Sequence, residues 1–244
     1  MKPLSIAELG TILSIWAHPD DETYLAAGVM SAARDRGQHV VCVSLTAGEH
    51  GTPDPRAWPP LRLGRRRTWE AAAAMAVLGV ADHCIVGLPD GGLAEHDEEG
   101  LAVVGHLLDD VRPDTILTFG PDGMTFHPDH QAVSGWVTAA WEERDRPCRL
   151  LYATSTVEHV ARFGALYEEI GTYMTDERPT GVEPDELAVH VELSGCLLDR
   201  KLTALAAMAS QTAELMAAVG PELFAAEVAE EAFVEAAARP TIAV

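Results

Sequence analysis

The stretch TILSIWAHPDDE, residues 11–22, joins a short apolar run to a histidine, a proline and three consecutive acids. The run TILSIWA is typical of a buried β-strand, and TYLAAGVMSAARDRG after it predicts a helix that ends at Gly37. Adjacent carboxylates repel each other, and a turn needs only one Asp or Asn. Asp20 and Asp21 therefore raise the question of whether this strand end is a turn or a functional site.

Short apolar runs alternate with longer helical patterns along the rest of the chain. We expect further strands at 39–48, 83–92, 114–123, 149–156 and 187–193, and helices from about 65, at 101–112, 130–146, 196–215 and 221–237. This alternation predicts an α/β fold, a Rossmann-like, mostly parallel sheet with helices on both faces. We expect a single domain over 1–244, with a core at about 10–160, a loop at 171–186, and a C-terminal strand and helices at about 186–238.

Composition excludes several classes of protein. The 244 residues are 48% hydrophobic and 23% charged, which is typical of a globular chain with a sizeable core. A net charge of −21 argues against a nucleic-acid or anionic-membrane surface, because both require clustered Lys and Arg. The four cysteines form no CxxC pair, and no apolar run is long enough for a signal peptide or a membrane span. We expect a cytoplasmic protein with reduced cysteines.

Polar clusters follow four of the expected strands. HPDDE follows the first strand, AGEHGT (47–52) the second and HPDH (127–130) the fourth, while LPDGG with Asp90 ends the third. Ligands bind at the carboxyl ends of the strands in an open parallel sheet. Turns alone do not require His and carboxylate residues at four strand ends, so the edge of the sheet formed by these carboxyl ends is the candidate site.

The two HPD motifs have the composition of a metal site. His18 and Asp21 are three residues apart, as are His127 and His130, so each pair shares a face if it starts a helix. The prolines within the motifs, Pro19 and Pro128, suit a first helical position. Catalytic zinc takes three ligands from His, Asp or Glu. One HPD triplet alone is common in turns, but two at strand ends of one sheet favour a metal bound by His18, Asp21 and His130.

Other candidate residues carry weaker signals. Arg67 lies in RRRTWE, where an Arg cluster is usually a solvated face, and Glu49 and Asp90 either line the cleft or cap loops. No GxGxxG, GxSxG or HExxH motif is present, which argues against a dinucleotide site, an α/β-hydrolase elbow and a zincin.

AHPDDE at 17–22 together with HPDH at 127–130 resembles the PIG-L/LmbE-like family of zinc-dependent de-N-acetylases. Its members include enzymes that act on N-acetylglucosaminyl-phosphatidylinositol, on mycothiol and bacillithiol precursors and on antibiotic sugars. The resemblance covers most of the chain, through SLTAGEHGT, RRRTWEAAAAMAVLG, LPDGGL and LDRKLTALAAMASQ. The paired motifs are specific, and the other segments support them.

The resemblance implies one zinc ion per chain, bound by His18, Asp21 and His130. It also implies roles for further residues, with Asp20 as the general base, His127 stabilising or protonating the tetrahedral intermediate, Asp129 supporting a histidine, and Arg67 contacting the substrate. Glu49 and Asp90 remain candidate substrate-binding residues from their place at the strand ends. Two positions depart from the family pattern, since Thr125 stands where some relatives have Tyr and Met208 where many have His.

The expected reaction is removal of an N-acyl group, such as acetyl, from an amino sugar or glycoside such as an N-acetylglucosamine derivative. Zinc lowers the pKa of water and polarises the amide carbonyl, while a carboxylate takes the proton. Alternatives are a zinc-dependent hydratase of an unsaturated dicarboxylic acid, a non-haem iron oxygenase and a non-catalytic metal- or sugar-binding module. The sequence leaves open whether the chain is a monomer or a homo-oligomer.

Overall fold

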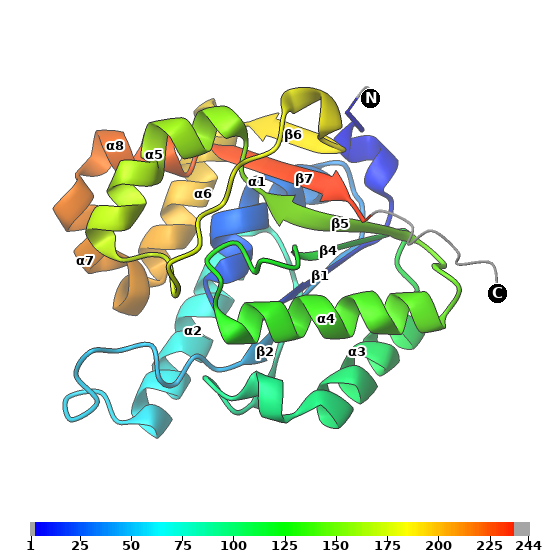
Figure 1. Cartoon of the computed structure of the whole chain (residues 1–244), viewed down its shortest axis with the longest axis horizontal. Coiled ribbons are helices and arrows are strands. Elements are labelled where there is room, and N and C mark those ends of the chain that lie inside the picture. The colour runs from blue at the N-terminus through cyan, green and yellow to red at the C-terminus, as the bar shows by residue number, and fades with distance from the viewer. Residues whose placement is uncertain (1–2, 237–244) are drawn as a thin grey trace.

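The computed structural model describes residues 3–236, in which one sheet of seven strands runs through the molecule (Figure 1). The strand order is β3-β2-β1-β4-β5-β7-β6. The first five strands are parallel, and β7 pairs antiparallel with both β5 and β6. Their bounds are β1 Ile12–Trp16, β2 Val40–Thr46, β3 Asp82–Leu88, β4 Thr115–Phe119, β5 Arg149–Thr154, β6 Val189–Glu192 and β7 Glu230–Glu235. The predicted fold class is confirmed.

Helices cover both faces of this sheet. Helices α1, α2 and α6 pack against one another on one side, while α3 and α4 pack together on the other. Helices α5, α7 and α8 gather beyond the carboxyl end of β5 (Figure 1). The bounds are α1 Asp21–Asp35, α2 Pro60–Leu78, α3 Asp97–Val111, α4 Pro128–Glu143, α5 Val157–Ile170, α6 Gly195–Ala207, α7 Ala209–Val219 and α8 Pro221–Glu227, with 3-10 turns at Ile6–Leu9, Leu93–Glu95 and Pro184–Glu186.

The position of the site follows from the central strands. Every residue of β1 and β4 is buried, because helices lie on both faces of this part of the sheet. From β1 the chain proceeds to β2 and β3 on one side, and it then crosses to β4 and β5 on the other. The strand order therefore reverses between β1 and β4, and a crevice opens at their carboxyl ends. The HPDDE and HPDH motifs follow these two strands.

The single helix predicted at 196–215 is wrong. The structure has α6 and α7, which meet at Met208 with a bend of 117°. Glu70 of α2 accepts hydrogen bonds from the backbone N–H and the hydroxyl of Ser210, so its carboxylate holds the start of α7. The Thr212 hydroxyl donates to a carbonyl of the last turn of α6. These side chains stabilise two helix ends where the sequence pattern is continuous.

The helix predicted at 221–237 is also wrong. Helix α8 ends at Glu227, and Glu230–Glu235 forms β7 between β5 and β6, while residue 237 lies outside the described residues. A segment rich in Ala and Glu has helical propensity, but pairing with two neighbouring strands overrides it. In addition, α2 begins at Pro60 rather than near Arg65, and α5 was not predicted.

No single helix among residues 3–236 has the length and hydropathy of a membrane span. Helices α6 and α7 have them only when counted together, across the bend between them. The four cysteines, Cys42, Cys84, Cys148 and Cys196, are all unpaired.

A fully buried ion pair joins α1, α6 and β7. The Lys201 ammonium lies 2.9 Å from the Glu231 carboxylate and donates to the carbonyl of Tyr24. The same carboxylate accepts the backbone N–H groups of Gly28 and Val29, in the middle of α1. Helix α1 begins with the HPDDE acids, so this pair fixes the helix that carries part of the site.

Replacing Lys201 with Met should therefore destabilise the fold by about 3–5 kcal/mol, because the Glu231 carboxylate would remain buried without its cation. Urea unfolding followed by circular dichroism measures this change. Asp35→Asn is the control, since it removes the half-exposed partner of Arg200 and should cost about 1 kcal/mol or less. Equal midpoints for the two variants would contradict a stabilising role for the buried pair.

Candidate active site

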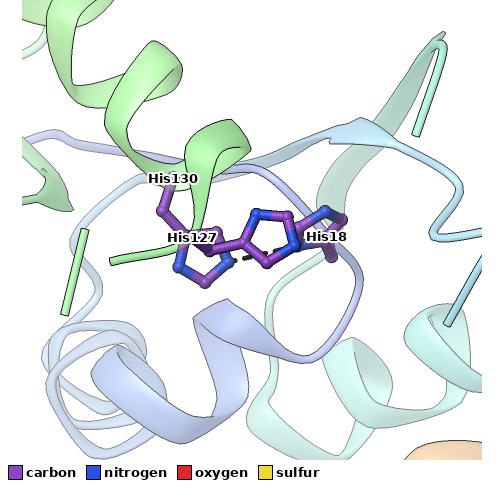
Figure 2. Close-up of side chains that lie close together, drawn as sticks. All are labelled: His18, His127 and His130. Carbon is purple, nitrogen blue, oxygen red and sulfur yellow. Dashed lines mark hydrogen bonds between the residues drawn. The ribbon is translucent and has the colours of Figure 1, made fainter. Parts of the chain in front are cut away.

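Three histidines from the two HPD motifs meet at the switch point of the sheet. His18 lies in the loop after β1, His127 is the N-cap of α4, and His130 lies in the first turn of α4, with Pro128 at the predicted first position (Figure 2). A ring nitrogen from each lies within 4.8 Å of the other two. His18 and His130 are buried, and His127 is half-buried. Segments more than one hundred residues apart thus form one cluster.

The atoms of His18, Asp21 and His130 have the spacing of metal ligands. Nδ1 of His18 lies 3.2 Å from Nε2 of His130 and 3.5 Å from Oδ2 of Asp21. Nε2 of His130 lies 3.4 Å from Oδ1 of Asp21. Ligands at ~2.0–2.1 Å from a tetrahedral zinc ion are separated by ~3.3 Å. These three residues therefore fit one such ion.

Carboxylates on the far side of the His18 ring determine its tautomer. Nε2 lies 3.0 Å from Oδ1 of Asp90 and 3.3 Å from Oδ2 of Asp129, so this nitrogen carries the proton. Asp129 is held in place by hydrogen bonds from the backbone N–H groups of Gly91 and Leu93. Burial opposes the charged ring, but Asp129, Asp21 and Asp90 raise the pKa of His18 well above its ordinary value. His18 Nδ1 faces the cluster, as in metal sites where a carboxylate orients a histidine ligand.

The orientation of the second buried imidazole, that of His130, is also fixed by a hydrogen bond on its far side. Nδ1 of His130 donates to the carbonyl of Gly123 at 2.9 Å, and the ring stacks on Phe119 with 4.1 Å between centroids. Its Nε2 lone pair therefore faces the cluster, opposite Nδ1 of His18. The two ring nitrogens and the Asp21 carboxylate converge on one point, where a proton on His18 Nδ1 or a metal cation can satisfy all three.

His127 is oriented differently. Its Nδ1 accepts the backbone N–H of Asp129 at 3.1 Å, so in the neutral ring the proton lies on Nε2. Burial, together with the nearby His130 and His18, lowers the pKa of His127 to about 4. The neutral ring offers an N–H donor toward the cluster. Ligation through Nε2 would require a proton shift that breaks the bond to Asp129.

The adjacent aspartates point apart because the backbone turns between them. Helix α1 begins at Asp21, so Asp20 is its N-cap and Pro19 lies outside the helix, contrary to the prediction for Pro19. Asp20 has φ 143°, a strained value for a residue with a side chain, of a kind that clusters at functional sites. The separation of the two carboxylates comes from this turn, and not from the helical spacing of neighbouring residues.

Arg67 is buried, with 4% of its side chain exposed, which excludes the solvated-face interpretation. Its guanidinium donates to the carbonyls of Gly48 and Pro19 and lies 3.2 Å from the Asp20 carboxylate. A Cβ at Gly48 or Gly51 would lie within 2.4 Å of the guanidinium, so the glycines of AGEHGT admit Arg67. The sequence signal for this contact was the pair of glycines.

The two aspartates differ in acidity. Burial raises the pKa of Asp20 to about 6, although the charge of Arg67 opposes this shift. Burial would also raise the pKa of Asp21, but His130 and His18 outweigh it and hold that pKa well below the ordinary range. Environments that separate two carboxyl pKa values are typical of sites where one carboxylate exchanges a proton and the other stays charged.

Glu49 and Asp90 form a loop contact beside the cluster. Glu49 accepts the backbone N–H of Asp90 at 3.3 Å, and Asp90 accepts that of His50 at 2.6 Å. Asp90 also contacts His18, a contact that the sequence did not predict. An oxygen of Asp90, an oxygen of Asp129 and a nitrogen of His18 form a second group within 4.8 Å.

The two departures from the family pattern lie in different environments. Thr125 lines a pocket together with His130, whereas Met208 is fully buried in the hydrophobic core at the junction of α6 and α7. The Met208 side chain therefore packs in the interior, and Thr125 is the departure that borders the site.

An α/β sheet with a His/carboxylate cluster at its switch point defines this chain as an α/β protein with a candidate metal-dependent active site. The model of the family described as PIG-L, GlcNAc-PI de-N-acetylase, matches residues 13–141, more than half of the chain. The chain belongs to this family. The 1D-myo-inositol 2-acetamido-2-deoxy-alpha-D-glucopyranoside deacetylase of Saccharomonospora viridis is 31% identical over 88% of each chain. The predicted family and enzyme class are confirmed.

Solved structures show the same fold at low identity. The N,N'-diacetylchitobiose deacetylase from Pyrococcus horikoshii has a TM-score of 0.67 at 20% identity, covering 95% of this chain and 85% of its own. GalB, the 4-carboxy-2-hydroxymuconate hydratase from Pseudomonas putida, has a TM-score of 0.62 at 16% identity, covering 97% and 100%. The fold therefore accommodates both hydrolysis and hydration.

Replacing His127 with Ala should leave metal binding intact and reduce kcat by ~10²-fold, the effect of losing one preorganised hydrogen-bond donor. Elemental analysis of the purified variant and steady-state kinetics measure the two quantities. Because His130 supplies a lone pair to the cluster, His130→Ala is the matched comparison and should lose metal. A metal-free His127→Ala protein would show that His127 is a ligand.

Proposed function

We propose that this protein is a zinc-dependent de-N-acylase that removes the acyl group from an amino sugar or glycoside. The observation that carries the proposal is the convergence of His18 Nδ1, His130 Nε2 and the Asp21 carboxylate within 3.5 Å of one another. Two histidines and one carboxylate are a common zinc ligand set that leaves a coordination position open. The names of the relatives support an N-acetylated sugar as substrate.

In this proposal, His18, Asp21 and His130 hold one zinc ion per chain. The ion supplies Lewis acidity, which polarises the amide carbonyl and lowers the pKa of a water molecule. Asp129 and Asp90 accept hydrogen bonds from His18 Nε2–H, so its Nδ1 would be the nitrogen that binds the ion. The ligand set is thus fixed by the hydrogen bonds behind it.

Asp20 acts as the general base for the attacking water. Its carboxylate is adjacent to the ligand Asp21 but is turned away by the backbone, and Arg67 fixes its position. The charge of Arg67 favours the anionic form, which is the form that accepts a proton. We assign Arg67 to positioning Asp20.

His127 acts on the other side of the reacting amide. Its neutral ring carries its proton on Nε2 and would donate a hydrogen bond to the oxyanion, while the proton that Asp20 takes from the water passes to the departing amine. Glu49 and Asp90, on the β2 and β3 loops, offer acceptors for sugar hydroxyls. This polar side of the site suits the amine half of the substrate.

The hydratase alternative rests on a shared fold alone, because GalB is 16% identical to this chain. The Saccharomonospora viridis relative, at 31% identity, is named as a deacetylase, which favours amide hydrolysis.

Unpaired cysteines agree with a reducing, cytoplasmic location.

The test is release of a free amine from N-acetylglucosamine and its glycosides by the zinc-loaded protein. We expect about one zinc per chain, loss of activity on chelation and recovery when zinc is restored. The hydratase alternative is measured in parallel, as loss of the absorbance of an unsaturated dicarboxylic acid. Hydration without amine release would overturn the proposal, and full activity after complete metal removal would exclude a metal mechanism.

Asp20→Asn and Asp21→Asn should fail in different ways. Asp21→Asn should bind zinc weakly and recover part of its activity in excess metal, whereas Asp20→Asn should retain zinc and lose ~10²-fold or more in kcat. In the wild type, kcat/KM should fall as the pH drops through about 6, because Asp20 becomes protonated. A bound dication lowers this pKa, so 6 is an upper limit for the acidic limb. Equal zinc loss in both variants would mean that both aspartates are ligands.

A further inference from the structure

A pocket of about 310 Å³ opens beside the proposed metal ligands. Asp21 and His130 form one end of it, and it extends over the carboxyl end of β5 beneath α5, α7 and α8. In Figure 1 these three helices stand together beyond the sheet. The methyl of an acetyl group would fill a small part of this space, so the pocket accommodates a much larger group.

The walls of this pocket are mainly apolar. Leu25, Leu166, Leu215 and Val219 are half-buried side chains that line it, and Phe224 closes it from within a small apolar cluster separate from the main core. These surfaces remain accessible in the folded chain. Covering apolar surface releases water and favours binding, roughly in proportion to the area removed from water.

Three polar side chains in the pocket wall, those of His159, Tyr167 and Glu227, are already paired with one another. The Tyr167 hydroxyl donates to Glu227 at 2.7 Å, and it lies 2.7 Å from Nε2 of His159. Because these partners satisfy one another, an apolar occupant leaves none of these hydrogen bonds broken, and a polar occupant gains little. The chemistry of the pocket therefore favours an alkyl chain.

The two halves of the substrate can be assigned from what borders each side of the ligands. The residues that we place on the water, the oxyanion and the leaving amine, namely Asp20, Arg67 and His127, do not line the pocket, and neither do Glu49 and Asp90. An amide positioned at Asp21 and His130 directs its amine toward His127 and its acyl group away from it. The pocket therefore lies on the acyl side.

We infer that the substrate is an amino sugar with an N-acyl chain longer than acetyl, and that this pocket binds the chain. This inference rests on the proposed function and names its substrate class. In the reaction, water adds its oxygen to the acyl carbon as the C–N bond breaks, and the nitrogen takes a proton. The products are a medium-chain carboxylic acid and a free amino sugar.

The experiment compares two series of compounds with the zinc-loaded protein. One series is glucosamine N-acylated with acetyl, butanoyl, hexanoyl or octanoyl, and the other is N-acetylglucosamine with methyl, hexyl or octyl as aglycone. We expect kcat/KM to rise about threefold per methylene along the acyl series, and at least tenfold from acetyl to hexanoyl. The aglycone series should stay within about twofold, because that half of the substrate lies outside the pocket.

Leu215→Glu places a carboxylate in the pocket and should lower the hexanoyl-to-acetyl ratio of kcat/KM at least tenfold. Leu223→Glu is the matched control, since Leu223 is exposed on neighbouring α8 and does not line the pocket, and it should keep the wild-type ratio. Leu166→Gln gives a milder test from the opposite wall if Leu215→Glu does not fold, as judged by circular dichroism.

Three results would overturn the inference. A preference for acetyl over every longer chain would leave the proposed deacylase intact and exclude an acyl pocket. A rise along the aglycone series alone would place the apolar group on the amine half. No amine release from any compound would overturn the proposed function as well.

Discussion

The site depends on two imidazole nitrogens, Nδ1 of His18 and Nε2 of His130, which hydrogen bonds on the far side of each ring hold facing each other. Carboxylates behind His18 and the Gly123 carbonyl behind His130 each accept a hydrogen bond from the outer ring N–H, so His18 Nδ1 and His130 Nε2 face each other at 3.2 Å, with room for one proton between them. The Asp21 carboxylate adds negative charge at the same point. A proton or a metal cation can occupy this point, so the hydrogen bonds that orient the two rings also define the candidate metal site.

The remaining groups divide into two sides around this point. Asp20 is separated from Asp21 by a strained backbone, and Arg67 holds it from a position that glycine at 48 and at 51 leaves free. On the other side, the pocket beneath α5, α7 and α8 is apolar. With a polar side and an apolar side around one ligand cluster, the site would bind an amphiphilic amide in one orientation. Binding energy from the two ends of the substrate would then position the reacting C–N bond.

The sequence predicted the parallel sheet and the strand ends that carry the site, because buried parallel strands are continuous apolar runs whatever their order. It failed where tertiary contacts compete with local propensity. Residues 230–235 read as helix but form β7 between two strands, and the pattern at 196–215 contains no sign of the bend that Glu70 stabilises from α2. Both failures involve partners distant in the sequence.

The sequence by itself determined which chemical groups gather at the site, since strand ends of one sheet bring HPDDE and HPDH together regardless of detail. Only the tertiary structure decided what each group does. Ring orientation in His18, His127 and His130 depends on hydrogen bonds to Asp129, Asp90 and Gly123, and the burial of Arg67 depends on how α2 packs on the β2 loop. A histidine offers a lone pair or a proton according to its partner, and spacing along the chain does not specify that partner.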